Sequence, residues 1–271
     1  MRSKKSERLM NISVNIPSWH RPDGVLTLDI MPFAKVWVDE SEAEEYRKHN
    51  PGAKIVSCPK GVQGNLCRVR NYILDTEFAN GADVVCLLDD DLKWIERFEY
   101  NADTGFAYEP YKLNADEILT FIEKYTIMAD ELGAKYWGIN ISQDKLNYKH
   151  NTPFSTKAVV LGPFSCHLKG TRCRYDESTL FKDDYDMAIQ QLNVERVILR
   201  VNSHHYICEQ STNVGGLATF RNRQREYEET MALRRKWGGQ IIKLDETNKG
   251  HTNKQKIFDY NPIVRIPIKG V

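Results

Sequence analysis

A buried strand that ends in three aspartates is the feature that most constrains the fold of this chain. Residues Val84 to Leu88 form an uninterrupted apolar run, and the acidic run Asp89 to Asp91 follows directly. An apolar run of this length suits a strand that is covered on both faces, as in parallel sheets. Open α/β sheets bind their ligands at the carboxyl ends of such strands. The sequence therefore predicts an α/β protein with a functional site next to these aspartates.

Strands and helices alternate along the rest of the chain, and no internal repeat or Pro/Gly-rich linker divides it. The predicted strands cover residues 11–16, 34–38, 54–57, 84–88, 136–141, 158–161 and 196–201. The predicted helices cover residues 40–49, 65–80, 114–132, 183–192 and 221–237, and a polar, irregular tail follows. Asn65 is predicted to cap its helix, and Asn114 with Glu117 three positions later forms a capping-box pattern. This order of elements predicts a single α/β domain.

Charge is balanced overall but unevenly distributed. The 271 residues carry 38 Lys and Arg against 37 Asp and Glu, which gives a net charge of +1. Residues 221–271 hold 12 basic and 6 acidic side chains, a net charge of +6, whereas residues 1–220 hold 26 and 31, a net charge of −5. The whole chain has no general attraction to nucleic acid or membranes, but its last fifth is a basic region on an acidic protein.

The cysteines and the apolar runs bear on location. Six cysteines are scattered without a CxxC pair, which indicates reduced, partly buried thiols, with a zinc site as the alternative. The basic N-terminus leads into a short alternating stretch, and no apolar run reaches the 18 residues of a spanning helix. We therefore expect a cytoplasmic protein that does not enter the membrane.

The three aspartates have the chemistry of a divalent metal site. If the strand geometry continues, Asp89 and Asp91 point to one side and Asp90 to the other. Two convergent carboxylates suit Mg²⁺ or Mn²⁺ that also binds phosphate oxygens, and a cation would offset the repulsion among the acids. A solvated acidic turn is the alternative. Neither a GxxxxGK(S/T) nor a GxGxxG pattern follows the first strand, so P-loop and dinucleotide-binding proteins are excluded.

Two segments resemble the A-type-fold (GT-A) glycosyltransferases. The helix sequence GNLCRVRN (Gly64 to Asn71), followed by Gly81-Ala82-Asp83 and the strand with its aspartates, is similar to their donor half, in which an Arg-Asn helix precedes a DxD motif. Arg174 to Glu177 and, six residues later, Asp184 to Asp186 resemble their acceptor segment. The resemblance covers Ser13 to Trp237.

Within that superfamily, the sequences PFAKVWV (Pro32 to Val38) and Glu42 to Glu44 look most like the phage TET/JBP-associated glycosyltransferases, which are associated with modified DNA bases. This resemblance implies a GT-A-like, Rossmann-type mixed sheet flanked by helices in one domain, residues 1–271. It also implies a donor half at residues 11–100, an acceptor and catalytic half at 101–220, and a basic helix and tail at 221–271.

The resemblance implies a catalytic pair at Asp183 and Asp184. In the family, the second acid of a Glu/Asp-Asp pair is the base, so Asp184 takes that role here. An inverting transfer needs a base to accept the proton of the attacking hydroxyl, and the sequence also leaves a retaining reaction open. The alternative role for Asp184 is that of an acid favoured by the dipole at a helix N-terminus.

The donor and metal ligands are implied in the same way. The resemblance assigns the nucleotide sugar to Pro17, Ser18, Asp39, Arg70, Asp89 and Asp90. It assigns a divalent metal to Asp89 and Asp91, with His204 or His205 as a third ligand. A helix N-cap is the alternative for Asp39. Core packing is the alternative for the histidines, because consecutive strand residues face opposite ways.

These features predict a metal-dependent glycosyltransferase that uses Mn²⁺ or Mg²⁺ and a nucleotide-diphosphate sugar such as UDP-glucose. The basic region and the resemblance together predict transfer to a hydroxymethylated pyrimidine in DNA, with Arg221, Arg223 and Arg225 at the DNA contact. One alternative is a glycosyltransferase with a saccharide or lipid-linked acceptor. Another is a non-catalytic nucleic-acid-binding module, which leaves both acidic clusters unexplained. A phage-encoded enzyme would work in the host cytoplasm.

Overall fold

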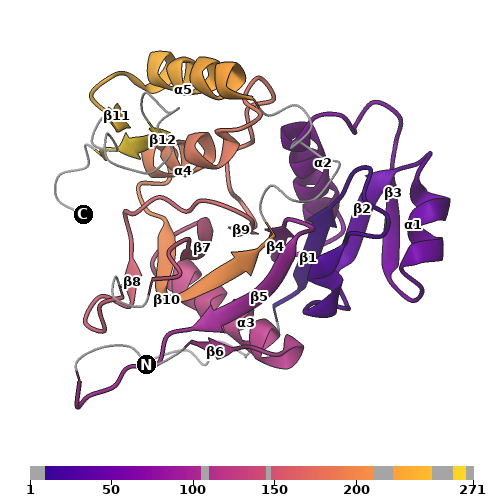
Figure 1. Ribbon diagram of the computed structural model, residues 1–271, viewed down its shortest axis with the longest axis horizontal. Coiled ribbons are helices and arrows are strands. Elements are labelled where there is room, and N and C mark those ends of the chain that lie inside the picture. Colours follow the sequence, from indigo (N-terminus) through magenta and orange to yellow (C-terminus); the bar gives the residue numbers. More distant parts are fainter. Residues whose placement is uncertain (1–9, 105–109, 145–147, 210–221, 246–258, 267–271) are drawn as a thin grey trace, which may run out of the picture.

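A ten-stranded mixed sheet forms the centre of the protein, and five α-helices surround it (Figure 1). The computed structural model describes residues 10–104, 110–144, 148–209, 222–245 and 259–266. The sheet consists of β1 (Ile12–Pro17), β2 (Lys35–Asp39), β3 (Lys54–Cys58), β4 (Val84–Leu88), β5 (Leu92–Arg97), β6 (Tyr111–Lys112), β7 (Tyr136–Asn140), β8 (Phe154–Ser155), β9 (Phe164–Leu168) and β10 (Leu199–Cys208). The helices are η1 (Leu26–Asp29, 3-10), α1 (Ala43–His49), α2 (Leu66–Ala79), α3 (Ala115–Glu131), α4 (Asp183–Val194) and α5 (Arg223–Trp237). The predicted fold class is confirmed.

β4 lies where the strand order changes direction: β2 and β3 are added on one side of β1, and β4 is added on its other side. The order is β3-β2-β1-β4-β9-β7-β10-β5-β6, with β8 beside β10. Strands β1 to β3 extend the sheet outward in parallel, and β4 then returns to pair in parallel with β1. Such a switch point leaves a crevice at the carboxyl ends of the two central strands, which is where open α/β sheets bind ligands.

The side chains of β4 divide between two apolar layers because strand residues alternate. Val85 and Leu87 pack in a cluster with residues of α2 and α4. Val84, Cys86 and Leu88 pack in a second cluster with residues of α1 and α3. All five residues of β4 are buried, as the apolar run predicts.

The local signals for helices are confirmed. The Asn65 side chain accepts a hydrogen bond from the Arg68 backbone N–H, which caps α2. Asn114 and Glu117 form the reciprocal bonds of a capping box at the start of α3. Each bond satisfies a backbone donor that the first turn of a helix leaves without a partner.

Three sequence-based assignments of strands are wrong or incomplete. Residues 158–161 are not a strand, and the strand lies instead at β9, after Gly162 with φ +85° and Pro163. The predicted strand 196–201 corresponds to β10, which begins later and continues to Cys208. The tail, predicted to be irregular, contains the antiparallel hairpin of β11 (Ile242–Asp245) and β12 (Asp259–Val264).

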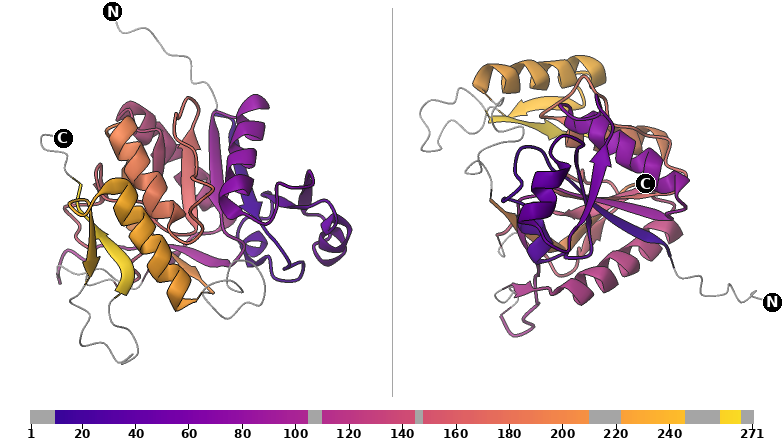
Figure 2. Two further views of the ribbon diagram at one scale, coloured as in Figure 1. Left: turned by 90° about the horizontal axis from the view of Figure 1, so that it is seen from above. Right: turned by 90° about the vertical axis from the view of Figure 1, so that its right-hand side faces the viewer.

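The C-terminal helix and hairpin lie on α4. Leu233 of α5 and Ile242 of β11 form a small apolar cluster with Tyr185 and Ile189 of α4. Figure 2 shows α5 beside α4 on the outside of the sheet. Within the described ranges, no helix combines the length and the apolar character needed to cross a bilayer.

Close packing between β7 and β9 gives a test of the fold. A Cβ atom at Gly138 would lie 2.3 Å from Cγ1 of Val160 and 2.7 Å from the carbonyl oxygen of Phe164. Gly138→Ala is therefore expected to lower the free energy of unfolding by about 1–3 kcal/mol, measured by urea denaturation. The control is Gly24→Ala, where the nearest atom is Arg21 Cβ at an ordinary 3.5 Å. Equal stability of the two variants would contradict this packing.

Candidate active site

An ion-pair network centred on Arg70 lies at the carboxyl end of β4. Alternation turns Asp89 toward the same helices that Val85 and Leu87 contact. There Arg70 of α2 donates to Asp89 Oδ1 at 2.7 Å through Nη2, and to Oδ2 of Asp183 through Nη1. The Arg70 side chain is only 8% exposed. Arg70 therefore joins the acid that follows β4 to the acid that begins α4.

The charges in this network depend on one another. Burial alone lowers the pKa of Arg70, but Asp183 and Asp89 raise it well above its usual value. Burial raises the pKa of Asp183, and Asp184 and Asp89 add to that effect while Arg70 opposes it. One buried guanidinium therefore balances two carboxylates that would otherwise repel each other.

The turn before β9 brings Asp184 to the same edge of the sheet. Because β9 runs antiparallel to β4, the backbone N–H of Asp89 donates to the carbonyl of Pro163 at 3.0 Å. The neighbouring Gly162 N–H donates to Asp184 Oδ2, also at 3.0 Å. A Cβ atom at Gly162 would lie 2.1 Å from the Tyr206 hydroxyl oxygen. Gly162 is thus required both for its positive φ and for the close approach of Tyr206.

The Tyr206 hydroxyl lies beside the Gly162 turn. Burial raises the pKa of this hydroxyl, and the negative charges of Cys208, Asp184, Asp89 and Asp91 add to the increase. Burial likewise raises the pKa of Asp184, while the N–H groups of Gly162 and Tyr185 hold its carboxylate. The Gly162 N–H, which lies against the Tyr206 hydroxyl, therefore binds the carboxylate at the start of α4.

Asp90 points to the opposite side of the strand and is fully engaged in the structure. Its Oδ2 accepts from the Ser18 hydroxyl at 2.6 Å and its Oδ1 from Arg21 Nη1 at 2.8 Å. Ser18 also contacts the Tyr46 hydroxyl at 2.9 Å, and Asp90 is 6% exposed. The Ser18 and Asp90 side chains, both predicted to contact the donor, are buried and bonded to each other in this structure. They fix the end of β4 against the end of β1.

Asp91 is the carboxylate best suited to a cation. Burial and the charges of Asp89 and Asp90, opposed by Arg21, together raise its pKa to about 7. No Lys or Arg of the described residues forms an ion pair with Asp91. The same part of the chain contains no ready group of three His, Cys, Asp or Glu ligands. Asp89 and Asp91 thus fit a divalent cation that takes its remaining oxygen ligands from a substrate or water.

Neither histidine of the predicted pair reaches this site. β10 pairs antiparallel with β5 so that Cys208 lies opposite Leu92 but His205 lies opposite Glu96, farther along the strand from the aspartates. His205 Nε2 contacts Glu96 Oε2 at 3.0 Å, and the His204 ring lies 4.3 Å from that of Phe121. Burial lowers the pKa of both rings, that of His204 to about 3. In this structure His205 contacts Glu96 and the His204 ring packs near Phe121, while their predicted role as metal ligands stays a prediction.

The remaining donor candidates lie along the neighbouring strand ends. Pro17 ends β1, opposite Trp37 of β2. Asp39 ends β2, and its Oδ1 accepts from the backbone and the hydroxyl of Ser41 at 3.0 and 2.6 Å. The N-cap of α1 is Glu42, so Asp39 stabilises the turn before the helix and is not its N-cap. Pro17 and Asp39 therefore lie at the same carboxyl edge of the sheet as Asp89.

The predicted DNA contacts are only partly described. Arg221 lies outside the described residues, and Arg223 is the first residue of α5. Arg225 is exposed, and its backbone N–H donates to the Asn222 cap. Lys236, at the other end of α5, pairs with Asp176 and Asp186 at 2.6 and 2.9 Å. Ion pairs with acids elsewhere in the chain thus neutralise part of the positive charge of residues 221–271.

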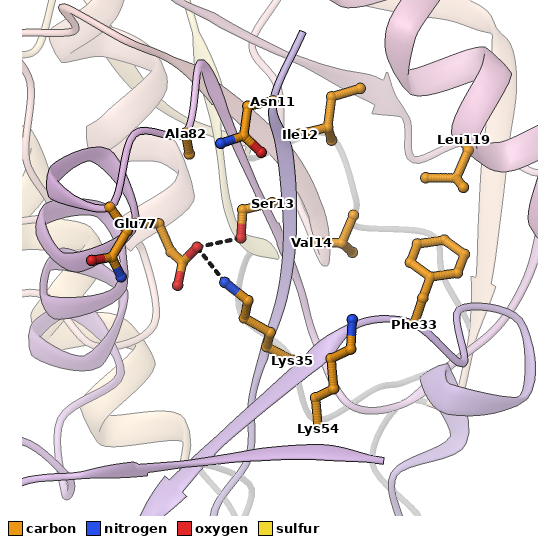
Figure 3. Close-up of a pocket in the computed structure, with 11 residues that line it drawn as sticks. Asn11, Ile12, Ser13, Val14, Phe33, Lys35, Lys54, Glu77, Ala82 and Leu119 are labelled. Atoms are coloured by element: carbon orange, nitrogen blue, oxygen red, sulfur yellow. Dashed lines mark hydrogen bonds and ion pairs between the residues drawn. The ribbon is translucent and has the colours of Figure 1, made fainter. Parts of the chain in front are cut away.

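Two cavities lie away from the acids. Figure 3 shows one of about 280 Å³ at the amino end of β1, where Glu77 Oε2 accepts from Ser13 and Lys35, each at 2.6 Å. The other, of about 580 Å³, is lined by Phe98, His204 and residues of α3. The first network fastens α2 to β1 and β2, so it supports the helix that carries Arg70.

Three residues of the site were missed by sequence reasoning. Arg21, Gly162 and Tyr206 contribute the bond to Asp90, the N–H for Asp184 and the hydroxyl beside that turn. The Gly162-Pro163 dipeptide is a turn signal that could have located the second. The other two carry no sequence pattern, because β10 and the loop after β1 meet the acids only in the folded sheet.

Comparisons with known proteins agree with this architecture. The structure resembles glucosyl-3-phosphoglycerate synthase from Mycobacterium tuberculosis, solved with Mn²⁺, UDP-glucose and glycerol 3-phosphate, with a TM-score of 0.51 and 12% identity over 87% of this chain and 84% of that one. It also resembles mannosyl-3-phosphoglycerate synthase from Rubrobacter xylanophilus, with a TM-score of 0.39 and 12% identity over 91% and 78%. No curated protein sequence matches the chain. The fold is that of the GT-A glycosyltransferases.

A family model described as TET-associated glycosyltransferase matches residues 12–216. The chain belongs to this family and is a glycosyltransferase. The match includes β1 to β10 and the acids at Asp89 to Asp91, Asp183 and Asp184, and it ends before α5.

The buried position of Arg70 predicts a large cost for its removal. Arg70→Gln leaves Asp89 and Asp183 without their common cation, and the free energy of unfolding should fall by about 3 kcal/mol or more. Arg68→Gln, on the same helix, is the control, because Arg68 and its partner Glu177 are 43% and 46% exposed. That loss should stay below about 1 kcal/mol. Similar losses in urea denaturation would show that the Arg70 network is not buried.

The raised pKa of Asp91 predicts how stability depends on pH. With a pKa near 7 in the folded protein against 3.8 for an ordinary Asp, the folded state holds an extra proton between about pH 4 and 7. Stability is therefore lost progressively as the pH rises from about 4 to 7, and the loss is complete above 7. In EDTA, Asp91→Asn should exceed the wild type in thermal midpoint at pH 8 and match it at pH 4. An equal difference at both pH values would contradict the shift.

Proposed function

We propose that this enzyme transfers glucose from UDP-glucose, or a similar nucleotide-diphosphate sugar, to the hydroxyl of a hydroxymethylated pyrimidine in DNA, with Mn²⁺ or Mg²⁺. The observation that carries the proposal is that Arg70 joins Asp89 to Asp183, while the Gly162-Pro163 turn binds both the Asp184 carboxylate and the Asp89 backbone. Donor-side and catalytic-side acids at one strand edge match the needs of a group transfer between two substrates.

Asp184 is the base in this proposal. The acceptor oxygen attacks the anomeric carbon, the bond from that carbon to the diphosphate oxygen breaks, and the acceptor proton passes to a carboxylate oxygen of Asp184. The Gly162 and Tyr185 N–H groups orient the carboxylate. Burial raises its pKa, which makes it a stronger base than an exposed Asp. Asp183, fixed by Arg70, supports the neighbouring peptide unit.

The donor side rests on the strand ends. Asp89 and Asp91 would hold the cation, which supplies positive charge to the leaving diphosphate. Pro17 and Asp39 border the space for the nucleoside. Arg70 keeps Asp89 in place and compensates its charge before the cation binds.

The acceptor side rests on the family and on charge. The chain belongs to a family described as TET-associated, and residues 221–271 carry a net charge of +6. We assign the DNA backbone to Arg221 and to Arg223 and Arg225 of α5. A pyrimidine inside a duplex cannot reach a buried carboxylate, so the base would leave the stack.

The experiment that tests this function measures nucleoside diphosphate release with UDP-glucose and other donors. Release should require a divalent metal and be abolished by EDTA or Asp91→Asn. It should also depend on an oligonucleotide with 5-hydroxymethylated pyrimidine and stop with the unmodified one. Asp184→Asn should reduce kcat at least ~10²-fold with little change in donor affinity.

The acceptor can be tested separately from the chemistry. DNA binding should weaken steeply with salt, and Arg225→Glu should weaken it equally for all sequences, because phosphate contacts carry no sequence information. Efficient transfer to a neutral saccharide, without DNA binding at low salt, would replace DNA as the acceptor and leave the metal and base assignments standing.

A further inference from the structure

The segment that carries the catalytic acids, Asp176 to Asp186, is held from two sides. From α2, Asn65 Nδ2 donates to the Glu177 carbonyl at 2.8 Å, and Arg70 holds Asp183. From the other side, α5 supplies a second set of polar contacts to the same segment. Residues 180–183 therefore lie between α2 and α5, and α5 follows the part of the chain that the family model matches.

Two glutamates of α5 bind the residues that lead into α4. Glu229 Oε2 accepts from the backbone N–H groups of Leu180 and Phe181 at 3.0 and 2.6 Å. Glu226 Oε2 accepts from Lys182 Nζ at 2.6 Å. The Lys182 side chain is 2% exposed and that of Glu226 14%, so solvent screens this pair little. Lys182 is the N-cap residue of α4, and only Asp183 separates it from Asp184.

The end of α5 binds the first turns of α4. Trp237 Nε1 donates to Asp186 Oδ1 at 2.7 Å, and Lys236 bridges Asp186 and Asp176. Asp186 is fully buried. Its carboxylate is therefore bound to α5 while its backbone belongs to the same helical turn as Asp184.

Apolar contacts extend the same support to the turn that binds the base. Leu161, which precedes Gly162, packs against the cluster of Tyr185, Leu233 and neighbouring residues. The carboxylate of Asp184 and its N–H donor at Gly162 thus both lie next to residues that α5 contacts.

We propose that α5 is a positioning element for catalysis, in which Glu226 and Glu229 fix residues 180–183 so that Asp184 stays against the Gly162 N–H. This inference rests on the proposed role of Asp184 as the base. It explains why so many acidic and basic side chains of α5 face inward. A helix placed only to attract DNA would direct its charges to solvent.

The test compares three isosteric substitutions on one helix. Glu229→Gln and Glu226→Gln should each lower kcat about 10-fold to 10²-fold, because small displacements of a catalytic group are costly. The Kd for UDP-glucose with Mn²⁺ should change less than about 2-fold, since the donor side does not contact α5. Glu228→Gln is the control, because Glu228 is exposed and bonds only Gln224 among the described residues. Its kcat should equal that of the wild type.

A double-mutant comparison separates positioning from general loss of structure. In an Asp184→Asn background, Glu229→Gln should cause no further fall in kcat, because the residue acts through Asp184. An independent fall in that background, or wild-type kcat in both glutamate variants, would overturn the proposal. All assays are run where circular dichroism shows native protein, and Glu229→Gln serves if Glu226→Gln, which leaves Lys182 buried without its partner, does not fold. If Asp184→Asn alone keeps full turnover, the assignment of Asp184 as the base fails. This single variant therefore tests the base independently of the glutamate variants.

Discussion

The organisation of the site depends on one buried cation between two acids. Arg70 lies on α2, yet its two Nη atoms bond Asp89 after β4 and Asp183 at the start of α4. A buried guanidinium is costly unless its partners are in place, and the buried Asp183 carboxylate is costly without it. The donor-side and catalytic-side elements are therefore stable together and in one relative position.

Strand alternation gives the three neighbouring aspartates different directions and different bonding partners. Asp89 faces Arg70 on the α2 and α4 side, and Asp90 faces Ser18 and Arg21 on the other side. Asp91 has a raised pKa because it is buried near two other acids. Asp90 thus fastens the strand end, so that Asp89 and Asp91 are available for a cation at a fixed place.

The charge asymmetry of the sequence has a physical role in the structure. Lys236 of α5 pairs with Asp176 and Asp186. In the other pair the acid comes from α5, because Glu226 binds Lys182. These pairs connect α5 with the segment that begins α4. The helix thereby supports the start of α4 through both basic and acidic side chains.

The sequence by itself determined the elements whose signals are local. The apolar run Val84–Leu88, the Asn65 cap and the capping box at Asn114 all depend on residues a few positions apart, and each has the predicted structure. Only the tertiary structure decided which groups meet at the carboxyl edge. Arg70, Gly162 and Tyr206 come from a helix, a turn and a strand far apart in the chain, and the histidines of β10 are kept away by strand register. Periodicity fixes the face on which a side chain lies, whereas its partners depend on the order in which strands pair, which no local pattern encodes.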